Sequence, residues 1–320
     1  MLTIKNLNKN YGKVKALEGL NLDIKEGEFF GFVGPNGSGK TTTMKIISGL
    51  LKGDSGSVIL DGIDAMKEPK LLKSKIGYMP DFFGVYDNLK VKEYMDFYAS
   101  IYGIVGKQAK RISMELMDLV DLKDKEEVYV DSLSRGMKQR LCLARTLIHN
   151  PKFLILDEPA SGLDPRARYE MKVILGEIKE RGKTILISSH ILPELAKMCT
   201  NLGIIESGKM IMTGTVDEIL TERGAFAPIN ITLIGDKEPA IKVLKRCHLV
   251  ENITIKGNKI TVVFNGNDEK ATDLLAQLIQ GGARVSSFSR EDSNIETLFM
   301  QITKKEDISE DEWNINGEML

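Results

Sequence analysis

The chain has 320 residues, of which 42% are hydrophobic and 28% are charged, a composition typical of globular proteins. Its 44 basic and 45 acidic residues argue against nucleic-acid binding, because proteins that bind nucleic acid usually carry a basic excess. The three cysteines, Cys142, Cys199 and Cys247, have neither metal-binding spacing nor an even framework, which favours a reduced, cytoplasmic environment.

Short apolar runs alternate with helical segments along residues 1–222. Strands are predicted at 29–34, 58–60, 76–79, 153–157, 184–189 and 202–208. Buried strands interleaved with helices predict an α/β domain around a largely parallel sheet. Apolar runs fall far short of the roughly 18 residues of a membrane span, and the first residues lack the apolar stretch of a signal sequence. We therefore expect any work at a membrane to go through a partner.

The sequence GPNGSGKTT at 34–42 matches the phosphate-binding pattern G-x-x-x-x-G-K-[ST]. A predicted strand precedes it and a predicted helix follows, an order that lets backbone N–H groups and a helix N-terminus face phosphate. This order disfavours the alternative of a glycine-rich turn without a ligand. Lys40 is expected to neutralise phosphate charge and Thr41 to hold Mg²⁺. The predicted phosphate-loop residues are Gly34, Pro35, Asn36, Gly37, Ser38, Gly39, Lys40, Thr41 and Thr42.

Two acids end the apolar strand in FLILDEP, residues 153–159. Ligands of open α/β sheets bind at the carboxyl ends of strands. Asp157 is therefore expected to reach the Mg²⁺ shell through water, and Glu158 to orient or deprotonate the attacking water. His190 ends TILISSH in the same way and is expected near the γ-phosphate. Solvated turn acids and a structural histidine are the alternatives.

Together with LSRGMKQR (133–140), SGLD (161–164) and SSH (188–190), these motifs resemble the nucleotide-binding subunit of ATP-binding-cassette (ABC) transporters over about residues 1–222. The resemblance implies a P-loop NTPase domain with a helical insert at about 82–150, in agreement with the helical apolar spacing of residues 88–127. It also implies ATP and Mg²⁺ as ligands, and two copies packed head to tail as an ATP-dependent homodimer. Each signature sequence would then cap the ATP of the other copy through Ser134 and Gly136.

Further roles follow from the same resemblance. Tyr11 would stack on adenine, unless it is partial core. Asp164 would signal across the dimer, and Ser134 would contact nucleotide, although both could also be helix N-caps. Asp81 stands where the family usually has Gln and is expected to keep a metal contact. Arg135 stands where Gly is commoner, either adding phosphate or ribose contacts across the dimer or remaining a solvated charge.

The pattern of strands and helices changes near residue 223, and residues 223–304 predict a ferredoxin-like βαββαβ domain. Its expected strands are 229–234, 250–256, 259–264 and 283–289, and its expected helices are 236–247, 268–280 and 294–303. It resembles the C-terminal extension of some bacterial drug- and antibiotic-export ATPases, and its role in dimer stability, regulation or ligand sensing stays open. Residues 305–320 form an acidic tail, expected to be frayed or flexible.

The leading hypothesis is the ATP-hydrolysing subunit of an exporter, working with integral membrane permease subunits at the inner face of the cell membrane. The segment with Phe82, Phe83 and Tyr86 and the helical insert would dock the permease, unless those aromatics pack into the insert. An alternative is a soluble ABC-type ATPase acting on ribosomes or DNA, but a second cassette and a long coiled-coil insertion are both missing. Intact Glu158 and His190 argue against a regulatory module with little hydrolysis. The transported substrate is not encoded in any motif.

Overall fold

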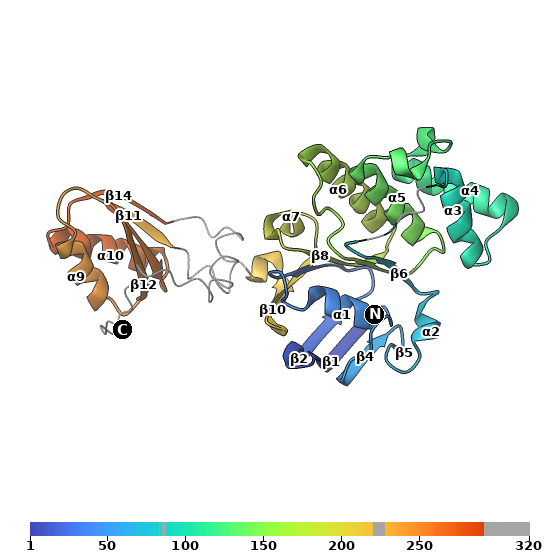
Figure 1. Cartoon of the computed structure of the whole chain (residues 1–320). Coiled ribbons are helices and arrows are strands. Elements are labelled where there is room, and N and C mark those ends of the chain that lie inside the picture. Colours follow the sequence, from blue (N-terminus) through green and yellow to red (C-terminus); the bar gives the residue numbers. More distant parts are fainter. Residues whose placement is uncertain (83, 85–87, 220–227, 291–320) are drawn as a thin grey trace. The chain divides into compact units, whose positions relative to one another are not determined.

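The computed structural model describes residues 1–82, 84, 88–219 and 228–290 (Figure 1). The chain divides after Val216 into two compact units, slightly before the predicted domain boundary at 222. Phe83, Tyr86, the expected helix 294–303 and the tail 305–320 lie outside the described residues. Among the residues that are described, no helix combines the length and apolar character needed to cross a membrane.

The N-terminal unit begins with an antiparallel sheet in the order β2-β1-β4-β5. Its first two strands alternate buried apolar residues with exposed polar ones, a pattern that suits a sheet with one covered face. The predicted strand 58–60 belongs to this sheet and not to the parallel one. The strands are β1 (Leu2–Tyr11), β2 (Val14–Ile24), β4 (Ser55–Leu60) and β5 (Ile63–Asp64).

The second sheet has the order β10-β9-β3-β8-β7-β6, and only its β9–β10 pair is antiparallel. The predicted, largely parallel core sheet is thus confirmed. The carboxyl ends of β3, β8, β7 and β6 lie next to one another at one edge, where ligands of such sheets bind. The strands are β3 (Phe29–Val33), β6 (Ile76–Met79), β7 (Phe153–Leu156), β8 (Thr184–Ser189), β9 (Asn201–Glu206) and β10 (Lys209–Thr215).

Helices cover both faces of this sheet. Helix α1 packs with the antiparallel sheet on one face and shares its apolar core, whereas α5 and α6 lie on the other (Figure 1). Helices α3 and α4 pack against each other and against α5, in the region of the predicted insert. The helices are α1 (Lys40–Ile47), α2 (Pro69–Leu72), α3 (Val91–Ile101), α4 (Gly106–Leu119), α5 (Arg135–Leu147), α6 (Pro165–Glu180) and α7 (Leu192–Ala196), with 3₁₀ turns at Lys123–Lys125 and Val130–Ser132.

Within residues 228–290, the C-terminal unit is an antiparallel sheet with two helices, in the chain order βαββαβ. Its strand order β12-β13-β11-β14 places the first strand beside the third and the fourth, which is the ferredoxin-like arrangement. Ile231, Val262 and Phe264 of the sheet form its core with Leu244 and Leu274 of the helices. The elements are β11 (Ile229–Leu233), α9 (Glu238–Arg246), β12 (Val250–Lys256), β13 (Lys259–Phe264), α10 (Asp268–Gln280) and β14 (Val285–Arg290).

Candidate active site

The phosphate loop connects β3 to α1 and is wedged against neighbouring backbone. A Cβ on Gly34 would lie 2.3 Å from the carbonyl oxygen of Ile205, and one on Gly39 would lie 2.7 Å from that of Ala16. Gly37 and Gly39 also have φ of +79° and +109°, a region that favours glycine. Three glycines are therefore required by the local geometry, and the loop enters the first turn of α1, where free N–H groups suit an anion.

Lys40 is almost fully buried, and its ammonium lies inside the loop. Its Nζ donates to the carbonyl oxygens of Gly34 at 2.6 Å and Pro35 at 3.1 Å, and lies 3.9 Å from Glu158 Oε1. Burial lowers the pKa of Lys40, while the carboxylates of Glu158 and Asp157 act in the opposite direction. A bound polyphosphate would give this desolvated cation a closer counter-charge than Glu158 does.

Asp157 and Glu158 follow β7, and Ser188 of the neighbouring β8 joins them. The buried Ser188 hydroxyl donates to Asp157 Oδ1 at 2.7 Å and accepts from the Glu158 N–H at 3.0 Å. Glu158 itself adopts φ of +50°, which is strained for a residue other than glycine and is common at functional sites. Ser188 thus fixes the backbone that aims the Glu158 carboxylate. Sequence reasoning gave Ser188 no individual role.

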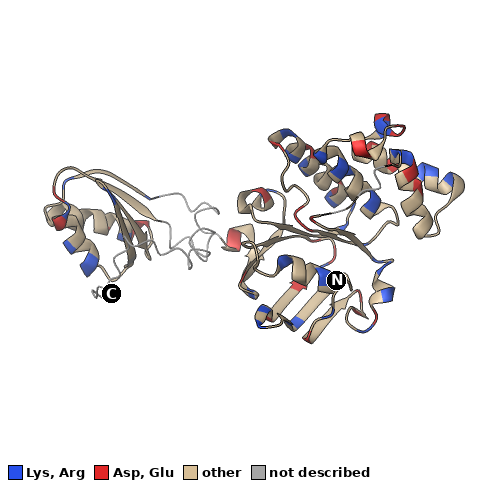
Figure 2. Ribbon diagram, in the orientation of Figure 1, with Lys and Arg blue, Asp and Glu red and all other residues tan. Residues whose placement is uncertain are grey.

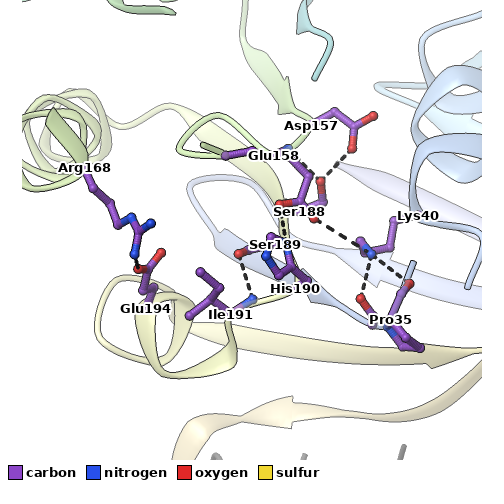
Figure 3. A network of polar contacts seen from close by, with 12 residues as sticks. Pro35, Lys40, Asp157, Glu158, Arg168, Ser188, Ser189, His190, Ile191 and Glu194 are labelled. Carbon is purple, nitrogen blue, oxygen red and sulfur yellow. Dashed lines mark hydrogen bonds and ion pairs between the residues drawn. The ribbon is translucent and has the colours of Figure 1, made fainter. Parts of the chain in front are cut away.

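His190 reaches the same carboxylate from the end of β8. Its Nδ1 lies 2.9 Å from Glu158 Oε2, and Figure 3 shows Lys40, Glu158 and His190 converging on one point. The His190 side chain is half exposed, whereas that of Glu158 is mostly buried. The imidazole can therefore meet solvent or a ligand on one side while it orients Glu158 on the other.

The donor atoms at this edge fit a hydrated Mg²⁺. Asp157 Oδ2 is buried without a hydrogen-bond partner, which leaves a carboxylate oxygen for metal-bound water. The described residues contain no cluster of three or more His, Cys, Asp or Glu side chains that could hold a metal. The rest of a Mg²⁺ shell would therefore come from the Thr41 hydroxyl, the expected contact with Asp81, phosphate oxygens and water.

Asp81 lies two residues beyond β6, within electrostatic range of Asp157. Burial raises its pKa and Asp157 raises it further, against smaller opposing contributions from Arg135 and His190. An added cation would relieve this repulsion. The departure from the usual Gln thus concentrates negative charge at the edge where phosphate and metal are expected.

The signature sequence lies at the start of α5 on the opposite face of the sheet from α1 (Figure 1). Ser134 is the N-cap of α5 and accepts a hydrogen bond from the Met137 N–H at 3.3 Å. Gly136 is buried, and a Cβ there would lie 2.9 Å from that of Ala167. Within the described part of the chain, no hydrogen bond or ion pair joins Ser134 or Gly136 to the phosphate loop of the same copy.

Asp164 and Tyr11 have local roles as well. Asp164 is the N-cap of α6 and accepts from the N–H groups of Arg166 and Ala167, both at 3.0 Å. Tyr11 ends β1 with half of its surface exposed, and Lys9 Nζ lies 5.7 Å from its ring centroid. An exposed aromatic face is available for stacking, and the adenine contact itself stays a prediction.

The sequence of the chain is similar to those of known proteins. A family profile described as ABC transporter matches residues 17–161. The linearmycin resistance ATP-binding protein LnrL of Bacillus subtilis is 32% identical over 305 residues, covering 95% of this chain and 98% of that protein. The bacitracin transport ATP-binding protein BcrA of Bacillus licheniformis is 32% identical, covering 93% and 95% respectively.

Solved structures share the fold of the N-terminal part. The ATP-binding subunit of an ABC transporter superimposes with a TM-score of 0.64 at 29% identity, over 70% of this chain and 93% of that one. A dimeric ATP-binding cassette in a post-hydrolysis state, bound to ADP and Pi, gives a TM-score of 0.62 at 27% identity, over 68% and 99%.

Proposed function

The chain belongs to the ATP-binding proteins of ABC transporters, and on that premise we propose how its own residues bind and hydrolyse ATP. It is an ATPase subunit of a transporter. In our proposal the backbone of residues 34–42 cradles the phosphates, and Lys40 turns from its carbonyl partners to the β- and γ-phosphates. The supporting observation is that this cation is buried, donates to two neutral carbonyl oxygens and has only a distant carboxylate 3.9 Å away, so that a polyanion would add a strong electrostatic attraction.

Glu158 acts as the group that orients or deprotonates the attacking water. The support is its geometry, because its carboxylate lies between Lys40 and His190 while Ser188 holds its backbone. His190 keeps the carboxylate aimed and offers its exposed edge to the γ-phosphate. Mg²⁺, held by Thr41, Asp81 and Asp157, would neutralise phosphate charge when bound.

Two copies pack head to tail in this proposal, because the signature sequence lies away from the phosphate loop of its own chain. Ser134, Gly136 and the positive end of α5 would then meet the nucleotide held by the second copy. A solved relative of the same fold is described as a dimeric, post-hydrolysis cassette with ADP and Pi, which supports this arrangement. ATP binding would close the interface between the two copies, and hydrolysis would open it.

The work of this cycle is export through integral membrane permease subunits at the inner face of the cell membrane. The support is that LnrL is described as a resistance protein and BcrA as a bacitracin transport protein. Apolar residues exposed on and beside the helical insert supply a docking surface of the kind that partners cover. They include Phe82, Phe97, Ile101, Val105 and Tyr129.

The substitution Glu158→Gln tests the site and the dimer together. It keeps the hydrogen-bonding shape but removes the base, so ATP turnover should fall by at least about 100-fold. Because binding is preserved, gel filtration with saturating Mg-ATP should show a stable dimer. The double variant Lys40→Ala with Glu158→Gln should no longer form that dimer and serves as the control. A monomeric Glu158→Gln protein under these conditions would contradict the head-to-tail site.

A further inference from the structure

The 160–164 loop follows Glu158 and joins it to α6. A cavity of about 320 Å³ lies between this loop, the end of β8 and helices α6 and α7. Its lining includes Glu158, the backbone at Gly162, and His190. Because packing leaves this space unfilled, polar contacts act together with the buried Leu163 side chain to set the position of the loop.

Arg135 holds one side of the loop from the start of α5. Its Nη2 donates to the carbonyl oxygen of Ser161 at 3.1 Å, and Gln139 Nε2 donates to the same oxygen at 3.3 Å. Gly162, at φ of +66°, leaves room for the guanidinium, because a Cβ there would lie 2.5 Å from three guanidinium atoms. Arg135 therefore lies on its own chain's loop, next to Ser134 and Gly136 of the signature sequence.

Arg168 holds the other side of the loop and continues to α7. Its Nη2 donates to the carbonyl oxygen of Leu163 at 3.3 Å, and its Nη1 forms an ion pair with Glu194 at 2.8 Å. Figure 3 shows Arg168 and Glu194 facing each other across from Ile191 and His190. Because α7 begins two residues after His190, a displacement of Glu194 acts on the imidazole that orients Glu158.

We propose that Arg135 and Arg168 are positioning residues that couple the signature sequence of each copy to that copy's own Glu158–His190 pair through the 160–164 loop. The proposal rests on the head-to-tail dimer proposed above. That dimer has two nucleotide sites between its copies. The signature sequence of one copy contacts nucleotide at one site, and the Glu158–His190 pair of the same copy acts at the other site. The arginines thus make hydrolysis at one site depend on nucleotide occupancy of the other.

A double-mutant cycle on the full chain tests this coupling. Arg135→Ala and Glu194→Gln alter the two ends of the relay, and no hydrogen bond or ion pair among the described residues joins these side chains directly. Independent sites would give a double variant whose loss in kcat is the product of the single losses. We expect each single variant to lose about three- to tenfold in kcat and to lower the Hill coefficient for ATP toward one. The double variant should lose no more than the larger single loss.

Controls separate positioning from simple instability. Arg135→Lys keeps a donor for Ser161 and should recover part of the cooperativity. Arg166→Ala removes an exposed ion pair with Glu170 on the same helix and should leave kcat and the Hill coefficient unchanged. Melting temperatures verify that every variant is folded, and Arg168→Met replaces Glu194→Gln if the latter is not.

Two outcomes would overturn the proposal, namely a multiplicative double variant or an unchanged Hill coefficient in Arg135→Ala. The Glu158→Gln dimer distinguishes this failure from failure of the proposed function. If Glu158→Gln dimerises with ATP and the cycle is multiplicative, the dimer stands and the relay is wrong. If Glu158→Gln stays monomeric, the head-to-tail arrangement itself is wrong.

Discussion

Close backbone contacts confine the phosphate loop, whereas the 160–164 loop relies on side-chain hydrogen bonds in addition to its own turn hydrogen bonds and the buried Leu163. Gly34 and Gly39 press against the carbonyl oxygens of Ile205 and Ala16, so the phosphate loop has almost no alternative position. The 160–164 loop lies above a cavity and depends on Arg135, Gln139 and Arg168. A binding loop gains from rigidity, because a preorganised site loses less entropy when ligand binds.

A loop that transmits a signal needs the opposite property. Its contacts must exchange between two arrangements without unfolding the core, and long polar side chains over a cavity permit that. The difference predicts that changes in the phosphate loop reduce nucleotide binding and stability together. Changes around Glu158 and the 160–164 loop should instead reduce turnover with smaller losses of binding.

Gly34→Ala is the change with the largest expected effect on the rigid side. Its Cβ would lie 2.3 Å from the carbonyl oxygen of Ile205 and 2.5 Å from Ser38 Oγ, so backbone must move. Overpacking of this kind costs about 1–3 kcal/mol in the free energy of unfolding. ATP affinity should fall by at least about tenfold, because the backbone N–H groups of the phosphate loop would no longer all point toward the phosphates. Denaturant unfolding and ATP binding by calorimetry measure the two effects.

Gly176 in α6 provides the matched control. It has no neighbour within 4 Å of an added Cβ and no positive φ, so alanine there meets open space. Gly176→Ala should raise stability by about 0.5–1 kcal/mol, since alanine favours the helix, and leave ATP affinity unchanged. Equal effects at the two glycines would show that sterics do not fix the phosphate loop.

The phosphate loop was predictable because its requirements are local. Its pattern lies between the strand before residue 34 and the helix after residue 39, and each glycine has a steric reason for its position. The carboxyl-end positions of Asp157 and His190 were predictable for a similar reason, since each ends a run of apolar strand residues.

Features that depend on strand pairing were not predictable from the sequence. Ser188 contacts Asp157 only because Leu156 pairs with Ile187 in the neighbouring strand. These paired residues are 31 positions apart in the sequence, so no local pattern indicates the contact. Strand 58–60 is too short to reveal which sheet it joins, and β1 is obscured by its lysines and asparagines. The sequence is compatible with either a nucleotide contact or a solvated charge for Arg135, whereas in the structure its guanidinium lies against Gly162 of its own chain.

Ser188→Ala comes next in expected size and tests how the carboxylates are aimed. It removes a donor to Asp157 and an acceptor for the Glu158 N–H, leaving two polar groups unsatisfied. Such a loss costs about 1–3 kcal/mol in stability, and kcat should fall about tenfold while ATP affinity changes less than about threefold. Steady-state kinetics with nucleotide-binding titrations separate the two. Ser189→Ala, which removes only the acceptor for Ile191 N–H, should have the smaller effect on kcat.

Asp81→Asn has the smallest expected effect. It measures how much the negative charge of Asp81 destabilises the folded protein. Burial and Asp157 raise the pKa of Asp81, so the ionised carboxylate destabilises the folded protein. The sign follows from linkage, because an acid with a raised folded pKa binds protons more tightly when folded. Its destabilisation is absent below its ordinary pKa, near 3.8, and is complete above the folded pKa.

Without nucleotide or metal, Asp81→Asn should therefore melt about 1–3 °C higher than the parent at pH 7. The difference should shrink as the pH falls through the raised folded pKa and should vanish only below about 3.8, where the carboxyl is protonated in both states. Asp64→Asn is the control of opposite sign. Burial raises the pKa of Asp64, but hydrogen bonds from Met66 and Lys67 together with the Lys67 charge outweigh burial, so the pKa is lowered and the charge is stabilising. A lower melting temperature for Asp81→Asn at pH 7 would mean that Asp81 is held by favourable contacts, and the repulsion that Mg²⁺ is expected to relieve would be absent.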